Sequence, residues 1–519
     1  MQLARLIGPL AVGVVLAGLS SAQDAVLPRG FSPLDLPGAD LRLVPESERP
    51  FRRVVIGLDP NTTRYFMVPS VESLDPKVRD PRVVFLRRQL YWMNFELVHG
   101  NFTKVAPAHT RFFVALPDPA LNPESLGNEE EVFREYLAVR AGWTKEQIAD
   151  RTRFFKVPIA IRYPQDMAQP LGYDGRKRLV LGLGMDVDHA YREGVKRLGD
   201  LFPNEFAVRD LPEVNTEGGD LDLTWLPERK LGVLVGHNRI LRYLHRKYGS
   251  VHEGRSVPRA RIEEARKAFS RAFFDLEVVI LNEEALRNPR FMTNELFHLD
   301  MVVNVLRSGT NILAFVPSYA EQPVDALTHV PLAEELRSRV QREYDWVANQ
   351  LSTRGYRVIR LPFADHPVRN PVNVAKYVDP VTGRAVVLLG KYPYHFATTP
   401  GGKIPQFELE DAFTRLEAVV DAWRAKPTDA RWNEVTATLQ RTWKEMDRIS
   451  ATPNPTFSDQ ARVYEMNGVK VVPVAIYPTG EGGLHCLGLA SNEGSRDSES
   501  TGSPAVATIG FRTARGGKR

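Results

Sequence analysis

The chain has 519 residues, 43% of them hydrophobic and 25% charged, a balance typical of globular proteins with a sizeable core. Its length suggests two to four domains, or one large repeat-built domain with additions. The net charge of +5 is small for this length, and the chain has no run of Lys and Arg and no stripe of aromatic and basic residues. These features argue against a nucleic-acid-binding protein.

The first 22 residues have the pattern of a secretory signal peptide. Arg5 precedes an apolar run over residues 6–19, and Ser20, Ser21 and Ala22 form a small-residue cleavage site. We expect cleavage near Ala22 and a secreted or periplasmic protein; the alternative is an ordinary apolar N-terminal helix. No cysteine stands directly after the cleavage site, which excludes a lipoprotein. No other stretch is long and apolar enough to span a bilayer, so we expect no stable membrane insertion after cleavage.

Residues 23–105 are predicted to form an N-terminal extension, to which the sequence assigns no role. Short strands are expected within it at residues 53–57 and 65–68, and a helix at 83–98. From residue 109 onward strands and helices alternate. Strands are predicted at 111–117, 158–163, 178–183, 356–361, 373–378, 385–389 and 469–476, hairpins at 220–225 with 231–235 and at 301–306 with 312–316, and helices around 132–137, from 258 and over 332–351.

One unit therefore recurs about five times: strand, turn, strand, helix, strand. Repeats of this kind can be arranged radially, so that the ends of their strands meet at a central channel. A helical pair at 407–449 interrupts the last unit, and we favour its packing on the outside over a role as a lid. Residues 496–519 are rich in Ser, Gly and Arg and are predicted to be a mobile tail.

Cys486 is the only cysteine of the chain and lies in the stretch Gly482-Gly483-Leu484-His485-Cys486. A single cysteine cannot form an internal disulfide, and most often it is a small buried hydrophobe. Here two glycines precede it closely, and they allow the backbone to take unusual angles and to admit a ligand. We therefore interpret Cys486 as a nucleophile that needs a base and substrate-holding groups from elsewhere in the chain.

Three further polar groups are predicted at the ends of strands. They are Tyr163-Pro164-Gln165-Asp166, Glu217-Gly218-Gly219-Asp220 and Phe297-His298-Leu299-Asp300-Met301. Taken singly, a carboxylate at a strand end is more often solvated or a helix cap, and a lone histidine is more often structural. His298 and Asp300 are stronger as a pair, because residues i and i+2 of a strand point to the same face and would line one pocket.

One thiol, one imidazole and two or three carboxylates together suit a guanidinium substrate. That group is planar, permanently cationic and a fork of hydrogen-bond donors. Two carboxylates can hold it by paired, charge-assisted hydrogen bonds and place its carbon over a nucleophile.

With these four motifs the sequence resembles the pentein, or guanidino-group-modifying, superfamily, which includes protein-arginine, arginine and agmatine deiminases and amidinotransferases. The resemblance covers residues 106–495 and implies a five-bladed α/β propeller as the catalytic domain. The family's motifs are matched, in order, by Gln165-Asp166, Glu217-Gly218-Gly219, His298-Leu299-Asp300 and Gly483-Leu484-His485-Cys486, and an asparagine of the fourth repeat by Asn373.

The resemblance also implies the role of each site residue. Asp166 and Asp300 hold the guanidinium, Cys486 attacks its carbon as a thiolate, and His298 protonates the departing amine and then activates water. A free thiol titrates near ~8.5, so its surroundings or the cationic substrate must activate it. Glu217, Asp220 and Asn373 are predicted to contact the substrate as well.

Two departures from the family pattern bear on substrate and metal. Leu487-Gly488-Leu489 replaces the Gly-Thr-Asn or Ile-Thr that follows the cysteine in the two branches most like this chain, which leaves the substrate open. Met167-Ala168-Gln169 replaces the acidic residues of calcium-dependent protein-arginine deiminases, which argues against calcium. We expect no cofactor. A zinc site at His298, Asp300 and His485 would lack a fourth ligand and leave the cysteine unused.

The sequence therefore predicts an exported deiminase that acts on an arginine-type guanidinium, preferably in a peptide or protein. A second hypothesis keeps the chemistry and changes the substrate to agmatine, to free arginine, or to a guanidine whose amidino group is transferred to another amine. A third is a catalytically silent propeller that only binds its ligand.

Overall fold

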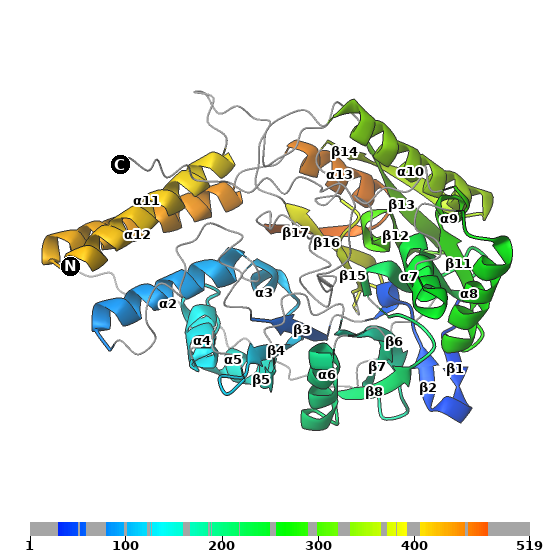
Figure 1. Ribbon diagram of the computed structural model, residues 1–519, viewed down its shortest axis with the longest axis horizontal. Coiled ribbons are helices and arrows are strands. Elements are labelled where there is room, and N and C mark those ends of the chain that lie inside the picture. Colours follow the sequence, from blue (N-terminus) through cyan, green and yellow to red (C-terminus); the bar gives the residue numbers. More distant parts are fainter. Residues whose placement is uncertain are drawn as a thin grey trace, which may run out of the picture.

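The computed structural model describes residues 30–49, 52–58, 79–97, 101–121, 125, 127–158, 167–184, 187, 189–216, 218–249, 256–288, 298–319, 333–364, 371–379, 381–391, 405–451 and 455–475. The predicted signal peptide, the predicted tail and the strands expected at 65–68 and 159–163 lie outside these residues. Within them the chain has a mixed α/β fold, in which five small sheets carry helices on their outer sides (Figure 1).

Three of the sheets have the same topology. The first two strands form an antiparallel hairpin, and the third strand is parallel to the second because a helical connection returns the chain to the same end of the sheet. These sheets are β9 (Leu221–Trp225), β10 (Leu231–Gly236) and β11 (Glu277–Leu281); β12 (Asn304–Ser308), β13 (Asn311–Tyr319) and β14 (Arg357–Phe363); and β15 (Ala375–Val378), β16 (Ala385–Lys391) and β17 (Lys470–Ala475). Both predicted hairpins are confirmed.

The other two sheets include strands from the predicted N-terminal extension. One has the same unit, made of β6 (Gln169–Tyr173), β7 (Leu179–Gly184) and β8 (Phe206–Leu211), with β1 (Leu34–Leu36) and β2 (Leu41–Leu43) added beside β6. The last is all parallel and contains β3 (Arg53–Gly57), β4 (Arg111–Pro117) and β5 (Thr152–Val157). Strand β5 ends at Val157, directly before the strand that the sequence predicted at 158–163. Residues 34–36, 41–43 and 53–57 of the predicted extension are therefore strands of two sheets.

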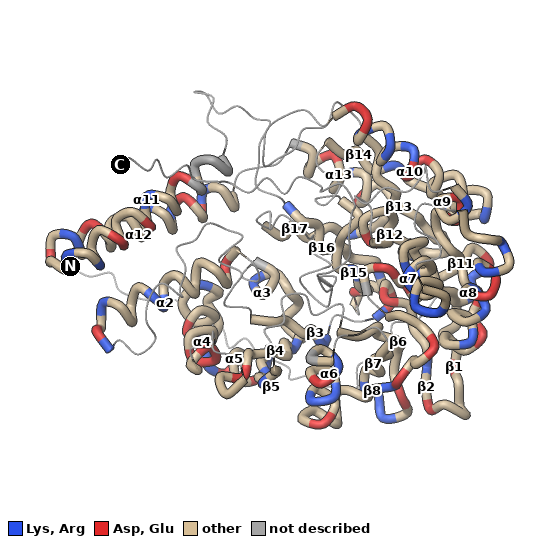
Figure 2. Tube along the Cα trace, in the orientation of Figure 1, with Lys and Arg blue, Asp and Glu red and all other residues tan. Residues whose placement is uncertain are grey.

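The helices connect the strands and cover the sheets. In chain order they are α2 (Pro81–Phe95), α3 (Asn101–Val105), α4 (Glu129–Val139), α5 (Lys145–Arg151), α6 (His189–Leu201), α7 (His237–Tyr248), α8 (Arg259–Ala272), α9 (Glu283–Arg287), α10 (Glu334–Thr353), α11 (Pro405–Ala425), α12 (Asp429–Ala451) and α13 (Pro455–Met466). Charged residues lie mainly on these helices and on the turns, whereas the central strands carry few (Figure 2). Helix α10 shows why: Val340, Tyr344 and Val347 form its buried stripe, and its charged residues other than Glu343 lie outside this buried face.

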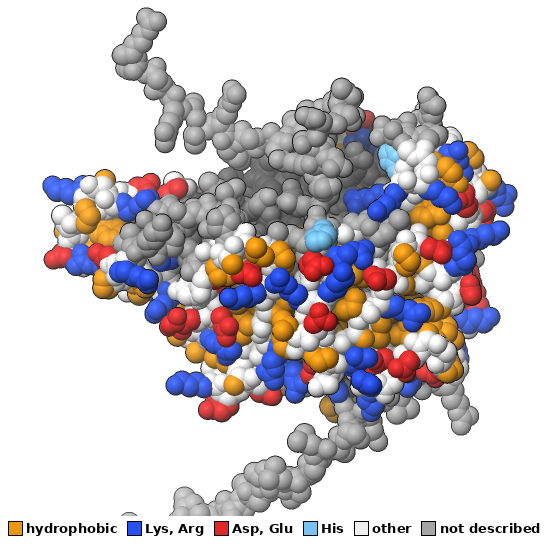
Figure 3. Space-filling view, turned by 60° about the horizontal axis from the view of Figure 1, so that its bottom comes forward, with side chains coloured by type: hydrophobic (Ala, Val, Ile, Leu, Met, Phe, Trp, Pro, Cys, Tyr) orange, Lys and Arg blue, Asp and Glu red, His pale blue; other side chains and the backbone are white. Residues whose placement is uncertain are grey.

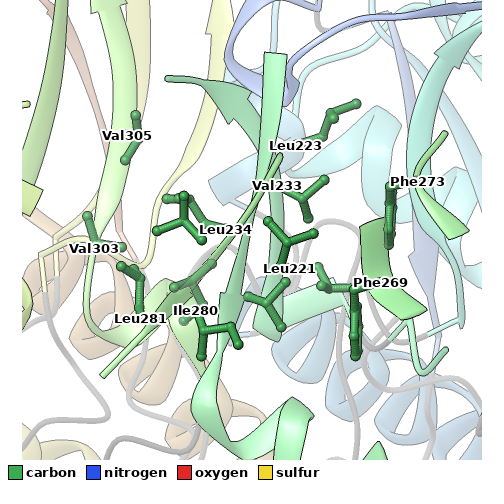
Figure 4. Packing of buried hydrophobic residues seen from close by; sticks show 14 of the residues in the cluster. Leu221, Leu223, Val233, Leu234, Phe269, Phe273, Ile280, Leu281, Val303 and Val305 are labelled. Carbon is green, nitrogen blue, oxygen red and sulfur yellow. The ribbon is translucent and has the colours of Figure 1, made fainter. Parts of the chain in front are cut away.

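Four hydrophobic cores join neighbouring sheets. Phe113 of β4 packs with Phe206 of β8, and Leu171 of β6 shares a core with β9–β11 and with Val305 of β12. Figure 4 shows part of this second core, in which Leu221, Val233 and Ile280 lie near Val303 and Val305. Phe315 of β13 shares a core with Val387 of β16, and Leu388 of β16 shares one with Val114 of β4. Each sheet therefore packs against two others in circular order. Among the described strands no hydrogen-bonded pairing joins one sheet to the next.

The helical pair predicted at 407–449 is confirmed as α11 and α12, and it packs on the outer side of α2 and α4. Leu416 and Leu439 share a hydrophobic core with Leu90 of α2. At the edge of this contact Arg140 lies over the ring of Trp443, 4.2 Å from its centre, and donates to Asp447 at 2.6 Å. The hairpin is thus anchored to the body of the protein by both apolar and charged contacts.

Basic and acidic side chains are interspersed over the described part of the face seen in Figure 3, with hydrophobic groups between them. Of the helices that the structure describes, none combines the length and the hydrophobicity required of a bilayer-spanning segment.

Candidate functional site

Two of the predicted motifs are in direct contact, although about 80 residues separate them in the chain. Gly219 packs against the imidazole of His298: a Cβ added at Gly219 would lie 2.5 Å from His298 Nδ1. One residue further on, Asp220 Oδ1 accepts a hydrogen bond from the backbone N–H of Leu299 at 3.1 Å. The Glu-Gly-Gly-Asp and His-x-Asp motifs therefore form one local structure.

The positions of two short 3₁₀-helices explain this meeting. The first, η7 (Gly218–Asp220), leads directly into β9, and the second, η9 (Leu299–Met301), precedes β12. The strands β9 and β12 are the first strands of adjacent sheets that share a core. Packing of the two sheets therefore brings the beginnings of both strands, and the motifs that precede them, to the same place.

The backbone of His298 and Asp300 is not the strand that the sequence predicted. Only His298 has extended backbone; Leu299, Asp300 and Met301 form η9, and the strand begins at Asn304. In a 3₁₀-helix the residues repeat every three positions, so side chains at i and i+2 point in different directions. His298 consequently lines one small cavity and Asp300 another, with Leu299 in the wall of both.

The cavity beside Asp300 contains a buried ion pair that the sequence analysis missed. Lys376 Nζ donates to Asp222 Oδ2 at 2.6 Å, and Glu46 lies in the same wall. Burial alone lowers the pKa of Lys376, but the carboxylates of Asp222 and Glu46 outweigh it and hold the pKa above its usual value. The ammonium is therefore retained in the cavity that Asp300 also lines. A signal was present: Lys376 and Asp222 are charged residues inside otherwise apolar strands.

Asp220 is placed to support the site. It is buried, and besides Leu299 it pairs with Arg239, whose Nη2 lies 3.4 Å from Oδ2. Arg239 is itself fully buried on α7. A substrate contact was predicted for Asp220; in the structure its Oδ1 contacts Leu299 and its Oδ2 contacts Arg239. This arrangement suits a residue that holds the His298–Asp300 segment in position.

The cavity on the side of His298 is lined by three further buried polar residues. His237 begins α7, Asn282 follows β11, and Glu343 lies in the middle of α10. Asn282 Nδ2 donates to Glu343 Oε1 at 2.7 Å. Burial lowers the pKa of His237 to about 4, so its ring is neutral near pH 7. None of the three belongs to a motif, so the sequence gave little reason to select them.

The segment around η2 (Glu46–Glu48) is inserted among the first strands of three sheets. Glu48 accepts from Arg307 of β12 through Nε and Nη2, both at 2.7 Å, and from Trp225 Nε1 of β9 at 2.9 Å. Glu46 reaches the cavity of Asp300, whose wall includes Lys376 of β15. Part of the predicted N-terminal extension thus forms one side of the candidate site.

The remaining predicted site residues fall into two groups. Asn373 is almost fully buried, and its neighbours Val372 and Val374 line the cavity of Asp300. Asp166, Glu217 and Cys486 lie outside the described residues, as does His485, so their roles stay predictions. Within the described part of the chain no group of three or more His, Cys, Asp or Glu side chains could hold a metal ion.

No protein-family model matches the chain, and a comparison with curated proteins found no match. Solved structures that align with it include a protein from Porphyromonas gingivalis provisionally described as an arginine deiminase, at 12% identity, over 86% of this chain and 97% of that one, with a TM-score of 0.43. Another is an amidinotransferase of saxitoxin biosynthesis from Microseira wollei, at 9% identity, over 87% and 97% of the two chains, with a TM-score of 0.32. Because both TM-scores are below 0.5, the function proposed below rests on the residues and contacts of this chain.

Proposed function

We propose that the protein is a guanidino-modifying hydrolase. It would convert an arginine-type guanidinium, preferably that of a peptidyl arginine, into a citrulline-type ureido group and release ammonia. The observation that carries this proposal is the packing of Gly219 and Asp220 against the His298–Asp300 segment. Two motifs of one catalytic pattern, distant in sequence, form one structure around a buried imidazole and a carboxylate.

The proposed reaction uses a covalent intermediate. Asp166 and Asp300 bind the guanidinium, and the thiolate of Cys486 attacks its central carbon. His298 then gives a proton to one nitrogen, which leaves as ammonia, and a thiouronium remains on the sulfur. His298 next takes a proton from a water that attacks the same carbon. Collapse of this adduct breaks the carbon–sulfur bond and releases the ureido product. Acid–base help of this kind contributes about 10²–10⁴ to a rate.

We also propose that the five sheets are the blades of a five-bladed α/β propeller with the site at its centre. The circular order of the four shared cores supports this arrangement. For the mature protein we propose export after cleavage near Ala22, and activity that requires neither a cofactor nor calcium.

The test is conversion of three guanidines by the purified protein that begins at Gln23. An arginine peptide, free arginine and agmatine are each incubated with the protein and with a Cys486→Ala variant, and ureido product and ammonia are measured by mass spectrometry and an ammonia assay. The proposal predicts a gain of one mass unit on the peptide that the variant does not produce. Conversion of only agmatine or free arginine would replace the substrate and keep the chemistry.

Two further outcomes would change the reaction class. Amidino transfer to an added amine such as glycine, without release of ammonia, would make the protein an amidinotransferase. No conversion of any guanidine, with or without calcium or an acceptor amine, would contradict the proposal and favour a binding protein.

A further inference from the structure

The cavity on the side of His298 is walled by polar groups from four separate elements. These are His237 of α7, Asn282 after β11, Glu343 of α10 and His298 itself, and their exposed fractions are between 2% and 4%. The remaining wall includes Leu281, Val302 and Val347. Apolar side chains close this polar site. Each buried donor and acceptor in it therefore needs a matching partner, because an unpaired buried polar atom is costly.

The printed contacts determine which atoms face this cavity. Asn282 has a left-handed backbone, with φ of 56°, and its side chain contacts Glu343 of α10. Its Nδ2 donates to Glu343 Oε1 at 2.7 Å, so its Oδ1 is left to accept. Within the described part of the chain, Asn282 Oδ1 and His237 Nε2 are both buried and lack a hydrogen-bond partner.

The neighbouring carboxylate selects the tautomer of His237. Its Nδ1 lies 3.9 Å from Glu343 Oε1, too far for a hydrogen bond but close enough for the charge to act. A proton on Nδ1 faces the negative oxygen favourably, whereas a lone pair there would be repelled. The neutral ring therefore carries its proton on Nδ1, and Nε2 is an acceptor, like Asn282 Oδ1.

Two acceptors in a cavity about the size of one water molecule require a donor of two protons. We propose that a single buried water donates to His237 Nε2 and Asn282 Oδ1 and that its oxygen accepts from the imidazole of His298. His237 is then a positioning residue that favours the N–H donor state of His298. This inference rests on the proposed function in one respect, since that reaction needs His298 as its proton donor.

Several charges surround His298 and act together with this water. Asp220 comes from η7, Asp300 from η9 and Glu343 from α10, while Arg239 of α7 is paired with Asp220. All of these charged groups act on His298 as well. The separate contribution of the water is therefore measured by changing His237, which is neutral near pH 7, and leaving every charge in place.

The experiment compares the wild type with His237→Phe and Asn282→Gly. Phenylalanine keeps a ring but removes the Nε2 acceptor, and glycine accepts the left-handed backbone while removing Oδ1. His237→Gln, which restores an acceptor, is the conservative rescue, and Thr438→Val is the matched control, because it removes a buried polar group on the distant α12.

Two readouts need no substrate. In a high-resolution crystal structure of the wild type, we expect a water within hydrogen-bond distance of His237 Nε2 and Asn282 Oδ1. In a ¹⁵N imidazole titration by NMR, we expect His237→Phe to lower the pKa of His298, and His237→Gln to restore it in part. A dry cavity in the wild type would overturn the proposal, and so would an unchanged titration in a folded His237→Phe.

Activity separates this inference from the proposed function. On the best guanidine we expect His237→Phe to lower kcat by about tenfold, with KM almost unchanged, because the acid is weakened and substrate contacts are kept. Thr438→Val should leave kcat as it is. A wild type that contains the water and shows the titration but converts no guanidine would contradict the proposed function alone. An active wild type whose kcat is insensitive to His237→Phe would contradict the positioning role.

Discussion

The backbone of Gly219 lies against the imidazole of His298, with room for a hydrogen at position 219 but not for a methyl group. A Cβ there would come within 2.5 Å of Nδ1 and 2.9 Å of Cγ, closer than side chains approach one another in proteins. Glycine at this position therefore allows η7 and η9 to approach, and the location of His298 depends on it.

We expect Gly219→Ala to reduce kcat/KM for the best guanidine by about 10²-fold, because a displacement of the catalytic group on the order of 1 Å has this effect. The matched control is Gly38→Ala, where an added Cβ meets nothing within 4 Å. Steady-state kinetics on both variants provide the check. Equal activity of the two variants would contradict this prediction. It would show that His298 moves without a loss of activity, or that its location does not affect the rate.

The Lys376–Asp222 ion pair should be important for stability. Lys376→Met removes the ammonium that pairs with the buried carboxylate of Asp222, so we expect a loss of about 3–5 kcal/mol in the free energy of unfolding. The additional change Asp222→Asn should recover part of it. Urea unfolding of both variants is the measurement, and Lys196→Met, which breaks an exposed pair with Glu193, is the control with little expected change.

The same variant has a predictable pH dependence. Because the folded pKa of Lys376 is raised, its stabilising effect is complete below the unfolded pKa of about 10.4 and is lost only as the pH rises through the folded value. The difference in stability between wild type and Lys376→Met should therefore be constant from about pH 6 to about pH 9. A difference that disappears near pH 8 would contradict the raised pKa.

The N-terminal strands should be necessary for folding. Glu48 joins Arg307 and Trp225 of two different sheets, and β2 pairs with β6. A protein that begins at Pro50 loses these contacts and should be insoluble or lack a cooperative thermal transition, whereas one that begins at Gln23 should fold. A narrower test is Glu48→Gln, which leaves Arg307 buried without a counter-charge and should cost about 3–5 kcal/mol of stability. Glu334→Gln, in an exposed pair with Arg337, is the control.

Burial of neutral His237 predicts sensitivity to acid. Its pKa is about 4 in the folded state and about 6.5 in the unfolded state, so the unfolded chain binds more protons between these values. Stability should fall as the pH is lowered from about 6.5 to about 4, by up to about 3 kcal/mol from this residue. Urea midpoints of the wild type and His237→Gln, compared at pH 7 and pH 4.5, should show a smaller loss in the variant. Equal losses would mean that other groups determine the acid response.

By itself the sequence determined the local secondary structure and the reactive side chains that the motifs contain. Apolar runs and turn residues predicted the hairpins of β9 with β10 and of β12 with β13, and the spacing of Val340, Tyr344 and Val347 predicted α10, because these signals depend on neighbours along the chain. The motifs likewise named His298 and Asp300. Only the tertiary structure decided how these parts meet. It placed Gly219 against His298, separated His298 from Asp300 by a 3₁₀-turn, and brought Lys376, Glu46 and His237 to the site. Those relations arise from the packing of one sheet on another, and no pattern within a single element encodes them.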